Sequence, residues 1–281
     1  MKKKKNLQIT TASGNRRDFS EEKVAASLRR SGAGEQIIDQ IISIIKEELH
    51  EGITTKEVYR RAFNLLRKKD RLVASRYKLK KAIYELGPTG YPFEHFVAAI
   101  LRHSGYLVEV SEVLQGECVT HEVDVIAEKD GKKILIECKF HGDQGRFCNV
   151  KVPLYIHSRF EDIRNHQLKR ETKIAPFDEG WVVTNTRFTA DALVYGKCAG
   201  LKLVSWDTPK GESLKERIDH LGLYPITVST ILSKREKQFL LSREVVLCRD
   251  LLKEDFLLDQ LEISAHRKKK ILNEMHVLCK H

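Results

Sequence analysis

The sequence lacks the features that mark disulfide-linked, membrane-spanning and secreted proteins. Its 281 residues include six cysteines, but no two of them form a Cys-x-x-Cys pair, so a disulfide framework is not expected. No run approaches the ~18 consecutive apolar residues that a membrane span requires. Four lysines, Lys2 to Lys5, follow Met1, yet the apolar segment of a signal peptide is missing after them. We therefore expect a cytoplasmic protein with no membrane partner.

Acidic residues are outnumbered, with 39 Asp and Glu against 50 Lys and Arg, which gives a formal net charge of +11 at pH 7. Excess positive charge favours an anionic partner, and nucleic acid is the leading one because Lys and Arg neutralise phosphates. A ribosome-like or membrane surface would attract the same charge, so the charge alone does not identify the partner. The Gly-x-x-x-x-Gly-Lys-Ser/Thr loop is absent, which excludes a P-loop motor ATPase. No serine or cysteine nucleophile constellation stands out.

Hydrophobic periodicity divides the chain into three parts. Residues 1–88 have the pattern of a short hairpin followed by helices, residues 89–208 alternate between strand and helix patterns, and residues 209–281 return to helical spacing. The turn sequence Gly87-Pro-Thr-Gly90 separates the first two parts. We predict a multi-domain α/β protein with a helical N-terminal domain, a mixed-sheet core and a small all-α C-terminal domain.

The first part is predicted as a hairpin and several helices. Ser20 and Thr54 each precede a helical pattern and are typical N-cap residues. The predicted segments are strands at 7–11 and 16–19, followed by helices that begin after Ser20, span 37–49, begin after Thr54 and span 74–83.

The middle part is predicted to have the order α-β-β-β-α-β-α-β, which indicates a mixed sheet. Glu128-Lys-Asp-Gly131 predicts a hairpin turn between the second and third strands. The predicted segments are a helix at 93–101, strands at 106–110, 123–127, 134–140, 180–184 and 201–205, and a helix around 189–199.

The strongest chemical signal lies on two of these predicted strands. Asp124 is separated by twelve residues from Glu137, and Lys139 follows two positions later. Strand residues alternate between faces, so Glu137 and Lys139 point the same way. If the two strands are antiparallel neighbours, Asp124 lies beside Glu137, and these carboxylates suit Mg²⁺ or Mn²⁺ as metal ligands. Lys139 would then orient or deprotonate an attacking water and balance charge during phosphodiester hydrolysis.

Two other interpretations of this segment stay open. The charged residues can be the solvated face of an amphipathic hairpin, although unpaired charges are costly in so apolar a strand. Alternatively, Cys118-x-x-His121 and Cys138-x-x-His141 form two Cys/His pairs of the kind that bind zinc. Against zinc, residues three apart on a strand diverge, and Cys138 faces away from the carboxylates. A buried structural cysteine is the simpler interpretation of Cys138.

Several motifs between residues 90 and 208 together resemble the Mrr-like restriction endonucleases of the PD-(D/E)xK nuclease superfamily. They are Gly90-Tyr-Pro-Phe-Glu-His95, Gly105-Tyr-Leu-Val108, Glu122-Val-Asp-Val-Ile-Ala127, Glu137-Cys-Lys139, and Val182-Val-Thr184 with Phe188-Thr-Ala190. The resemblance implies a DNA endonuclease with Asp124 and Glu137 as metal ligands and Lys139 as the catalytic lysine. Glu94 matches the acidic residue on the first helix of that family. The family's glycine-rich approach to the aspartate is missing, which leaves substrate preference open.

Motifs of the N-terminal part resemble a second family, the ATP-cone domain of ribonucleotide reductases and their repressor. They are the hairpin around Gly14, Phe19-Ser-Glu-Glu-Lys-Val24, Gly52-Ile-Thr-Thr-Lys-Glu-Val58 and Ala74-Ser-Arg-Tyr77. The resemblance implies regulatory binding of ATP or dATP. The family's Lys-Arg pair is replaced by Thr11-Ala12, so phosphate contacts are expected from Lys5, Arg16, Arg17 and Lys23. A helical protein-interaction domain with a basic surface is the alternative.

The C-terminal part offers a weaker signal. A basic run, Arg267 to Lys270, follows a cap at Ser264 and is similar to half of a helix-hairpin-helix, a unit that binds the DNA backbone, but the turn glycines of that motif are missing. A solvated basic helix face is the favoured explanation of the run.

These observations together predict a Mg²⁺-dependent DNA endonuclease regulated by ATP or dATP. Its partners would be DNA and nucleotide, and nucleotide binding could act by changing the state of a homo-oligomer. The alternative is a non-catalytic, nucleotide-responsive DNA-binding regulator. Clustered carboxylates favour the enzyme, because a pure binder has little use for them where phosphate must approach.

Overall fold

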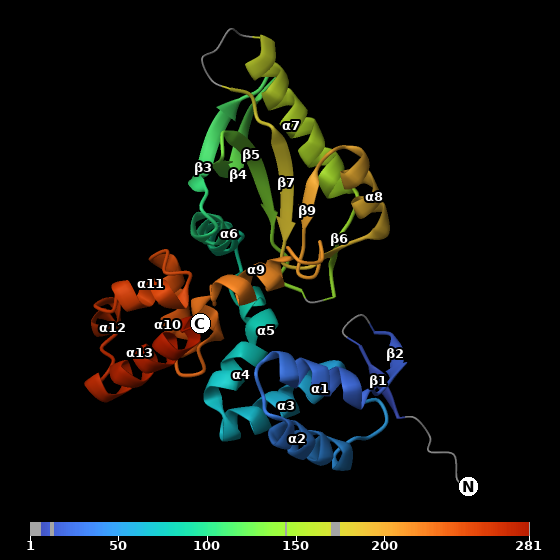
Figure 1. The fold of residues 1–281 in the computed structure, drawn as a ribbon, viewed down its shortest axis with the longest axis vertical. Coiled ribbons are helices and arrows are strands. Elements are labelled where there is room, and N and C mark those ends of the chain that lie inside the picture. Colours follow the sequence, from blue (N-terminus) through green and yellow to red (C-terminus); the bar gives the residue numbers. More distant parts are fainter. Residues whose placement is uncertain (1–6, 12–13, 144, 170–174, 281) are drawn as a thin grey trace.

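The computed structural model of the chain is elongated, with its helical and β-sheet regions arranged along one axis (Figure 1). It describes residues 7–11, 14–143, 145–169 and 175–280. In Figure 1 the N-terminal helices lie at one end, the β-sheet at the other, and the C-terminal helices pack beside the junction between them. The predicted order of a helical, a mixed-sheet and an all-α part is therefore present along the chain.

The N-terminal region begins with the predicted hairpin, in which Ile9 lies opposite Arg17. The predicted caps are also present: the Ser20 hydroxyl accepts a hydrogen bond from the Lys23 amide at 3.3 Å, and Thr54 forms a reciprocal capping box with Glu57. Buried side chains of these helices form a core of their own. The elements are β1 (Gln8–Thr10), β2 (Arg16–Asp18), α1 (Glu21–Arg30), α2 (Glu35–Glu47), α3 (Thr55–Lys69) and α4 (Arg71–Tyr77).

The prediction of one continuous helix over 74–83 is wrong. The segment is split between α4 and α5 (Leu79–Tyr84), and Lys78 lies at the break. The Lys78 ammonium is buried, where it contacts Glu85 Oε2 at 2.7 Å and donates to the Thr227 carbonyl at 2.9 Å. Burying an ammonium is costly unless it is paired. Because its carbonyl partner is 149 residues away, local periodicity carries no sign of this break.

The described residues of the middle region contain a mixed sheet, as predicted, and its strands have the order β3-β4-β5-β7-β9. The first three strands are antiparallel, and β5, β7 and β9 are parallel. Helix α6 covers one face, where Ile136 belongs to the core shared with Phe96. Helix α7 covers the other, where Leu135 packs in a cluster with Phe160. The bounds are α6 (Tyr91–His103), β3 (Leu107–Gln115), β4 (Thr120–Lys129), β5 (Lys132–Lys139), α7 (Lys151–Lys169), β7 (Glu179–Thr184), α8 (Ala190–Cys198) and β9 (Lys202–Val204).

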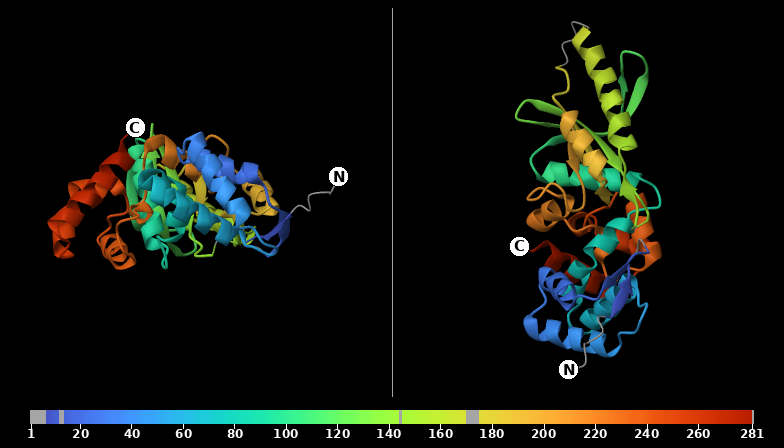
Figure 2. Two further views of the ribbon diagram at one scale, coloured as in Figure 1. Left: turned by 90° about the horizontal axis from the view of Figure 1, so that it is seen from below. Right: turned by 90° about the vertical axis from the view of Figure 1, so that its right-hand side faces the viewer.

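The hairpin of β3 and β4 is longer than predicted, and α7 holds its loop in place. Asp162 on α7 accepts hydrogen bonds from the Cys118 amide at 2.9 Å and contacts His121 Nε2 at 2.7 Å. The bond to His121 is the main reason why the pKa of Asp162 falls to about 2. A Cβ at Gly116 would lie 2.0 Å from Asp162 Oδ2, so this approach requires glycine. Figure 2 shows α7 running alongside the sheet toward this hairpin.

Two short parallel strands, β6 (Phe147–Cys148) and β8 (Arg187–Phe188), were not predicted, because two residues are too few to show alternation.

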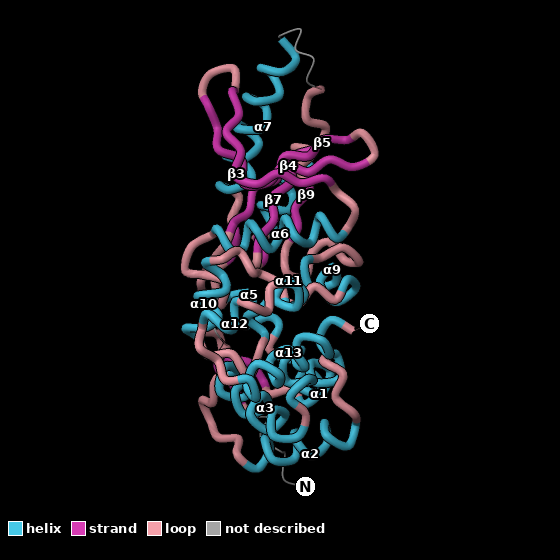
Figure 3. Tube along the Cα trace, turned by 90° about the vertical axis from the view of Figure 1, so that its left-hand side faces the viewer, coloured by secondary structure: helices cyan, strands magenta, loops and turns pink. Residues whose placement is uncertain are grey.

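The C-terminal helices pack against α5 and α6 and share one apolar core with the sheet. Figure 3 shows α6 lying between the sheet and these helices. A buried carboxylate ties the region to α4: Glu274 accepts hydrogen bonds from the hydroxyls of Ser75 at 3.1 Å and Ser229 at 2.5 Å. The elements are α9 (Leu214–Leu221), a 3₁₀ turn (Ile226–Val228), α10 (Lys234–Ser242), α11 (Cys248–Lys253), α12 (Leu257–Gln260) and α13 (Ala265–Cys279). Within the described ranges, no helix has the length and apolar character needed to cross a bilayer.

Candidate active site

Strand register brings Asp124 and Glu137 together. In the antiparallel pair of β4 and β5, Val125 lies opposite Ile136, and the next pair in this register is Asp124 with Glu137. Asp124 Oδ2 also accepts a hydrogen bond from the Cys138 amide at 2.7 Å. This bond holds the Asp124 carboxylate against β5, close enough to Glu137 that, besides burial, its charge raises the pKa of Glu137.

The side chains of β5 alternate as expected. Glu137 shares a face with Leu135, toward α7, whereas the Cys138 side chain is buried in the core beneath α6. Cys118 is exposed in the hairpin loop, six residues before Asp124, which corresponds to about 20 Å along an extended strand. The two Cys/His pairs therefore do not converge, and Cys138 is a structural core residue.

A third carboxylate comes from another element. Glu94 lies in the first turn of α6, where burial, followed by the charges of Asp124 and Glu122, raises its pKa to about 7. Burial and the Asp124 charge likewise raise the pKa of Glu137 to about 7, and burial raises that of Asp124. Like charges in a partly buried site disfavour ionisation. The cluster therefore has an excess of negative charge that a bound cation would relieve.

One basic residue of the site was missed at the sequence level. Arg159 lies on α7, and its Nη1 donates to Glu137 Oε2 at 2.8 Å. The two side chains are only 12% and 16% exposed, so this ion pair is largely shielded from water. The guanidinium also lies over the ring of Tyr155, 5.5 Å from its centroid. No motif marks Arg159, because it is 20 residues beyond Lys139 on a helix that only the folded chain brings to the sheet.

Lys139 is the last residue of β5, and its side chain is exposed. Its backbone is fixed, because the Thr184 hydroxyl donates to the Lys139 carbonyl at 2.7 Å. The chain beyond the strand is fixed too: the His141 amide donates to Asn185 Oδ1 at 2.9 Å, and Asn185 Nδ2 donates back to the His141 carbonyl at 2.8 Å. An exposed side chain therefore extends from a strand end that hydrogen bonds hold in place.

The carboxylates of this site suit Mg²⁺ better than a metal that takes all of its ligands from protein side chains. Among the described residues, no group of three or more His, Cys, Asp or Glu side chains is arranged to hold a metal ion. Mg²⁺ does not require one, because it keeps several waters and is typically held by one or two carboxylates plus substrate phosphate. Asp124 and Glu137 supply two neighbouring carboxylates, which meets that requirement.

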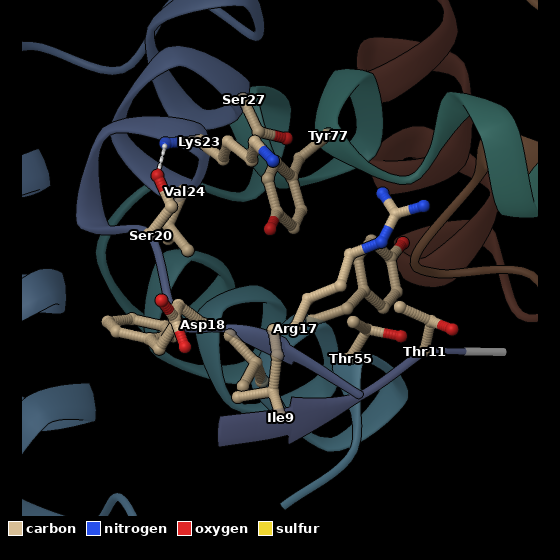
Figure 4. Close-up of a pocket in the computed structure, with 13 residues that line it drawn as sticks. Ile9, Thr11, Arg17, Asp18, Ser20, Lys23, Val24, Ser27, Thr55 and Tyr77 are labelled. Atoms are coloured by element: carbon tan, nitrogen blue, oxygen red, sulfur yellow. Dashed lines mark hydrogen bonds between the residues drawn. The ribbon is translucent and has the colours of Figure 1, made fainter. Parts of the chain in front are cut away.

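Of the four residues predicted to bind nucleotide, two line a common cavity in the described part of the chain. Arg17 and Lys23 line a cavity of about 300 Å³ in the N-terminal region, together with Tyr59 and Tyr77. Figure 4 shows Lys23 on one wall of this cavity, near Ser27 and Tyr77, and Arg17 on another. Arg16, also on β2, is not among the described residues that line it. Lys5 lies outside the described residues.

Comparison with known proteins places most of the chain in one family. A protein of Archaeoglobus fulgidus described as uncharacterized is 32% identical over 179 residues, which cover 63% of this chain and 97% of that protein. A crystal structure of a protein of unknown function, AF1548, is also 32% identical, with a TM-score of 0.56 and coverage of 68% of this chain and 98% of that one. The chain belongs to the AF1548-like family.

Two family models match separate parts of this AF1548-like protein. Residues 88–208 match the model described as restriction endonuclease, which covers all of the candidate active site. Residues 224–279 match the model of the AF1548-like C-terminal region. A structure of Can2 from Sulfobacillus thermosulfidooxidans in complex with cyclic tetra-adenylate is 14% identical, with a TM-score of 0.31 over 65% of this chain and 50% of that one, a similarity too low to indicate a shared fold. The middle region is thus a restriction endonuclease-like domain.

Proposed function

We propose that this AF1548-like protein is a metal-dependent DNA endonuclease that hydrolyses phosphodiester bonds. The observation that carries the proposal is the closeness of Asp124 and Glu137, one position beyond the pair of Val125 and Ile136, in a partly buried carboxylate cluster next to the exposed Lys139. The match of residues 88–208 to restriction endonucleases supports the same chemistry. A basic chain with a net charge of +11 is suited to a polyanionic substrate.

Each residue has a role that follows from its position. Asp124 and Glu137 would hold Mg²⁺ or Mn²⁺, and a bound cation would polarise the scissile phosphate as a Lewis acid. Lys139, as an ammonium, would orient the attacking water and balance the negative charge that develops on the phosphate. Glu94, with its raised pKa, would hydrogen-bond water at the rim of the cluster.

Incubation of the purified full-length chain with supercoiled plasmid and Mg²⁺ tests this proposal. Nicked or linear DNA that is absent when EDTA is added would support the nuclease. Supercoiled DNA that stays intact with both Mg²⁺ and Mn²⁺, while the protein binds it, would favour a non-catalytic DNA-binding regulator instead.

Arg159 is expected to act as a positioning residue for Glu137. Removing the charge with Arg159→Leu should lower cleavage at limiting Mg²⁺ by roughly 10–100-fold, the usual effect of losing a partner that orients a metal ligand. The half-saturating Mg²⁺ concentration should rise, and Arg159→Lys should restore part of the activity. Mg²⁺ titrations of the cleavage rate provide the measurement.

The matched control for this prediction is Arg164→Leu on the same helix. Arg164 is 43% exposed and lies 3.8 Å from Glu161, away from the carboxylate cluster, so its loss should leave the Mg²⁺ titration unchanged. An Arg159→Leu chain that folds and keeps the wild-type Mg²⁺ dependence would refute the positioning role.

We further propose that ATP or dATP binds the N-terminal cavity and regulates cleavage. The Tyr59 and Tyr77 rings are stacked at 5.1 Å and line this cavity with Arg17 and Lys23. The buried Tyr59 hydroxyl has no hydrogen-bond partner among the described residues, which is costly unless a ligand or water satisfies it. Aromatic rings beside cationic side chains suit a base and its phosphates.

Charge reversal at Lys23 should therefore weaken nucleotide binding. Loss of one charge-assisted hydrogen bond costs about 1.5–3 kcal/mol, so Lys23→Glu should raise the dissociation constant for ATP by roughly 10–100-fold. Isothermal titration gives this constant. Plasmid cleavage without nucleotide should stay at the wild-type rate, because Lys23 lies in a different region from the carboxylate cluster.

One control variant and one further measurement on the wild type complete this experiment. Lys46→Glu on α2 carries the same charge change on an exposed side chain that does not line the cavity. Nucleotide should also change the sedimentation mass or the cleavage rate of the wild type without being hydrolysed. If the wild type binds neither ATP nor dATP at millimolar concentration, the regulatory proposal fails and the nuclease proposal stands.

A further inference from the structure

A second, larger cavity lies where the regions of the chain meet. It has a volume of about 740 Å³, within the range of small-molecule sites, and we call it the junction cavity. Its walls come from the connection between α5 and α6, from the residues that follow β5, and from α10. Figure 3 shows α5 and α10, two helices that contribute lining residues, beneath the sheet. The residues that matter most are Lys78, Tyr84, Glu85, Phe140, Lys234 and Lys237.

Lysines outnumber carboxylates among the described residues that line the cavity, and two of these lysines are buried. Lys78 and Lys237 both donate to the Thr227 carbonyl, at 2.9 and 3.0 Å, and each side chain is only 9% exposed. Glu85, which lines the cavity, has its Oε2 2.7 Å from the Lys78 ammonium and 3.9 Å from the Lys237 ammonium. The buried Glu274, outside this lining, also favours the charged form of Lys237. Lys234 at the start of α10 adds a third positive charge to the lining.

The charge imbalance is costly in the absence of an anion. Burial, together with the neighbouring Lys78, lowers the pKa of Lys237 to about 7, which means that its charged form is poorly stabilised there. Lys237 also donates to the Ser229 carbonyl at 2.6 Å, and neutral carbonyls compensate a buried ammonium less completely than an anion does. A negatively charged ligand would correct this deficit.

The cavity lies close to the candidate active site. Phe140 directly follows Lys139, and Gly142, which also lines the cavity, comes two residues later. Consecutive Cα atoms are 3.8 Å apart, so Gly142 lies within about 11 Å of Lys139. Tyr84 and Phe140 supply aromatic surface to the same cavity, and nucleic acid bases stack on aromatic rings regardless of sequence.

We propose that the junction cavity binds one nucleoside phosphate unit, with the phosphate on Lys78, Lys234 and Lys237 and the base against Tyr84 and Phe140. The unit can come from the DNA strand that is being cut or from a free nucleotide, because the recognised chemistry is the same. Only the first source rests on the proposed nuclease function. Neither source involves the N-terminal cavity, which is lined by different residues.

The test measures binding of two probes to the full chain, namely dAMP and a short 5′-labelled DNA duplex. Both titrations are made in the Lys23→Glu chain, to exclude the N-terminal cavity, and in Ca²⁺, to avoid dependence on cleavage. Lys234→Glu is the test variant, because Lys234 is exposed and its substitution should not disturb folding. Lys237→Gln is not used, because Lys237 is buried. Arg235→Glu, the exposed neighbour on α10 that does not line the cavity, is the matched control.

Lys234→Glu should weaken at least one probe about tenfold more than Arg235→Glu does, the size of one charge-assisted hydrogen bond. A selective effect on the duplex assigns the unit to the DNA substrate, and a selective effect on dAMP assigns it to a free nucleotide. Equal effects of the two variants on both probes would overturn the proposal. Neither binding titration requires hydrolysis. A chain that does not cleave DNA would therefore refute the nuclease proposal and leave the proposal for the junction cavity to be judged by these titrations.

Discussion

Lys139→Ala is expected to cut DNA at least about 10³-fold more slowly than the wild type, because it loses both the orientation of the attacking water and electrostatic stabilisation at the scissile phosphate. The fold should not change, since Lys139 is exposed and its strand end is held through its backbone carbonyl by Thr184. DNA affinity should fall only several-fold, the effect of losing a single phosphate contact.

Single-turnover cleavage of a labelled duplex, together with DNA binding in Ca²⁺, measures both quantities. Lys132→Ala is the matched control, because Lys132 lies on the same strand at its other end, with a side chain that is 68% exposed. Lys132→Ala should cut at the wild-type rate. Cleavage by Lys139→Ala within threefold of the wild type, in a preparation free of contaminating nuclease, would show that Lys139 has no part in the chemistry.

Removal of divalent cations is expected to abolish cleavage altogether. Without a cation, the negative charges of Glu94, Asp124 and Glu137 repel a phosphate and leave nothing to polarise it. Mg²⁺ and Mn²⁺ should restore the activity, whereas Ca²⁺ should restore binding only, because it is larger and coordinates too flexibly to impose the required geometry.

A dialysis series tests this dependence directly. The EDTA-treated chain is assayed with each cation in turn, and circular dichroism before and after treatment shows whether the fold has survived. Cleavage that continues in excess EDTA would contradict the assignment of Asp124 and Glu137 as metal ligands. Cleavage supported equally by Ca²⁺ would contradict a magnesium-like geometry.

The central pair of carboxylates could be predicted because strands follow a simple rule. Alternation along β5 places Glu137 and Lys139 on one face, and the turn at Asp130 and Gly131, both with positive φ, sets the antiparallel register that brings Asp124 beside Glu137. These relations are local in sequence. Helix caps at Ser20 and Thr54 could be predicted for the same reason.

Features that depend on distant partners could not be predicted. Lys78, at the break between α4 and α5, donates to the distant Thr227 carbonyl, and the ion pair of Arg159 with Glu137 joins α7 to the sheet on which it packs. The junction cavity is lined by residues from widely separated parts of the chain, 78–88, 140–142 and 234–238. A motif or a periodicity cannot signal such contacts, because neither records which segments meet in space.

The most direct test of the nuclease account is the single-turnover cleavage rate of Asp124→Asn in Mg²⁺, compared with the wild type. Asparagine keeps an oxygen that can accept the Cys138 amide hydrogen bond, so the fold should persist while the negative charge that binds the cation is lost. The account predicts a rate at least about 10²-fold lower, with DNA binding in Ca²⁺ reduced far less. Equal cleavage by the two proteins would contradict the account.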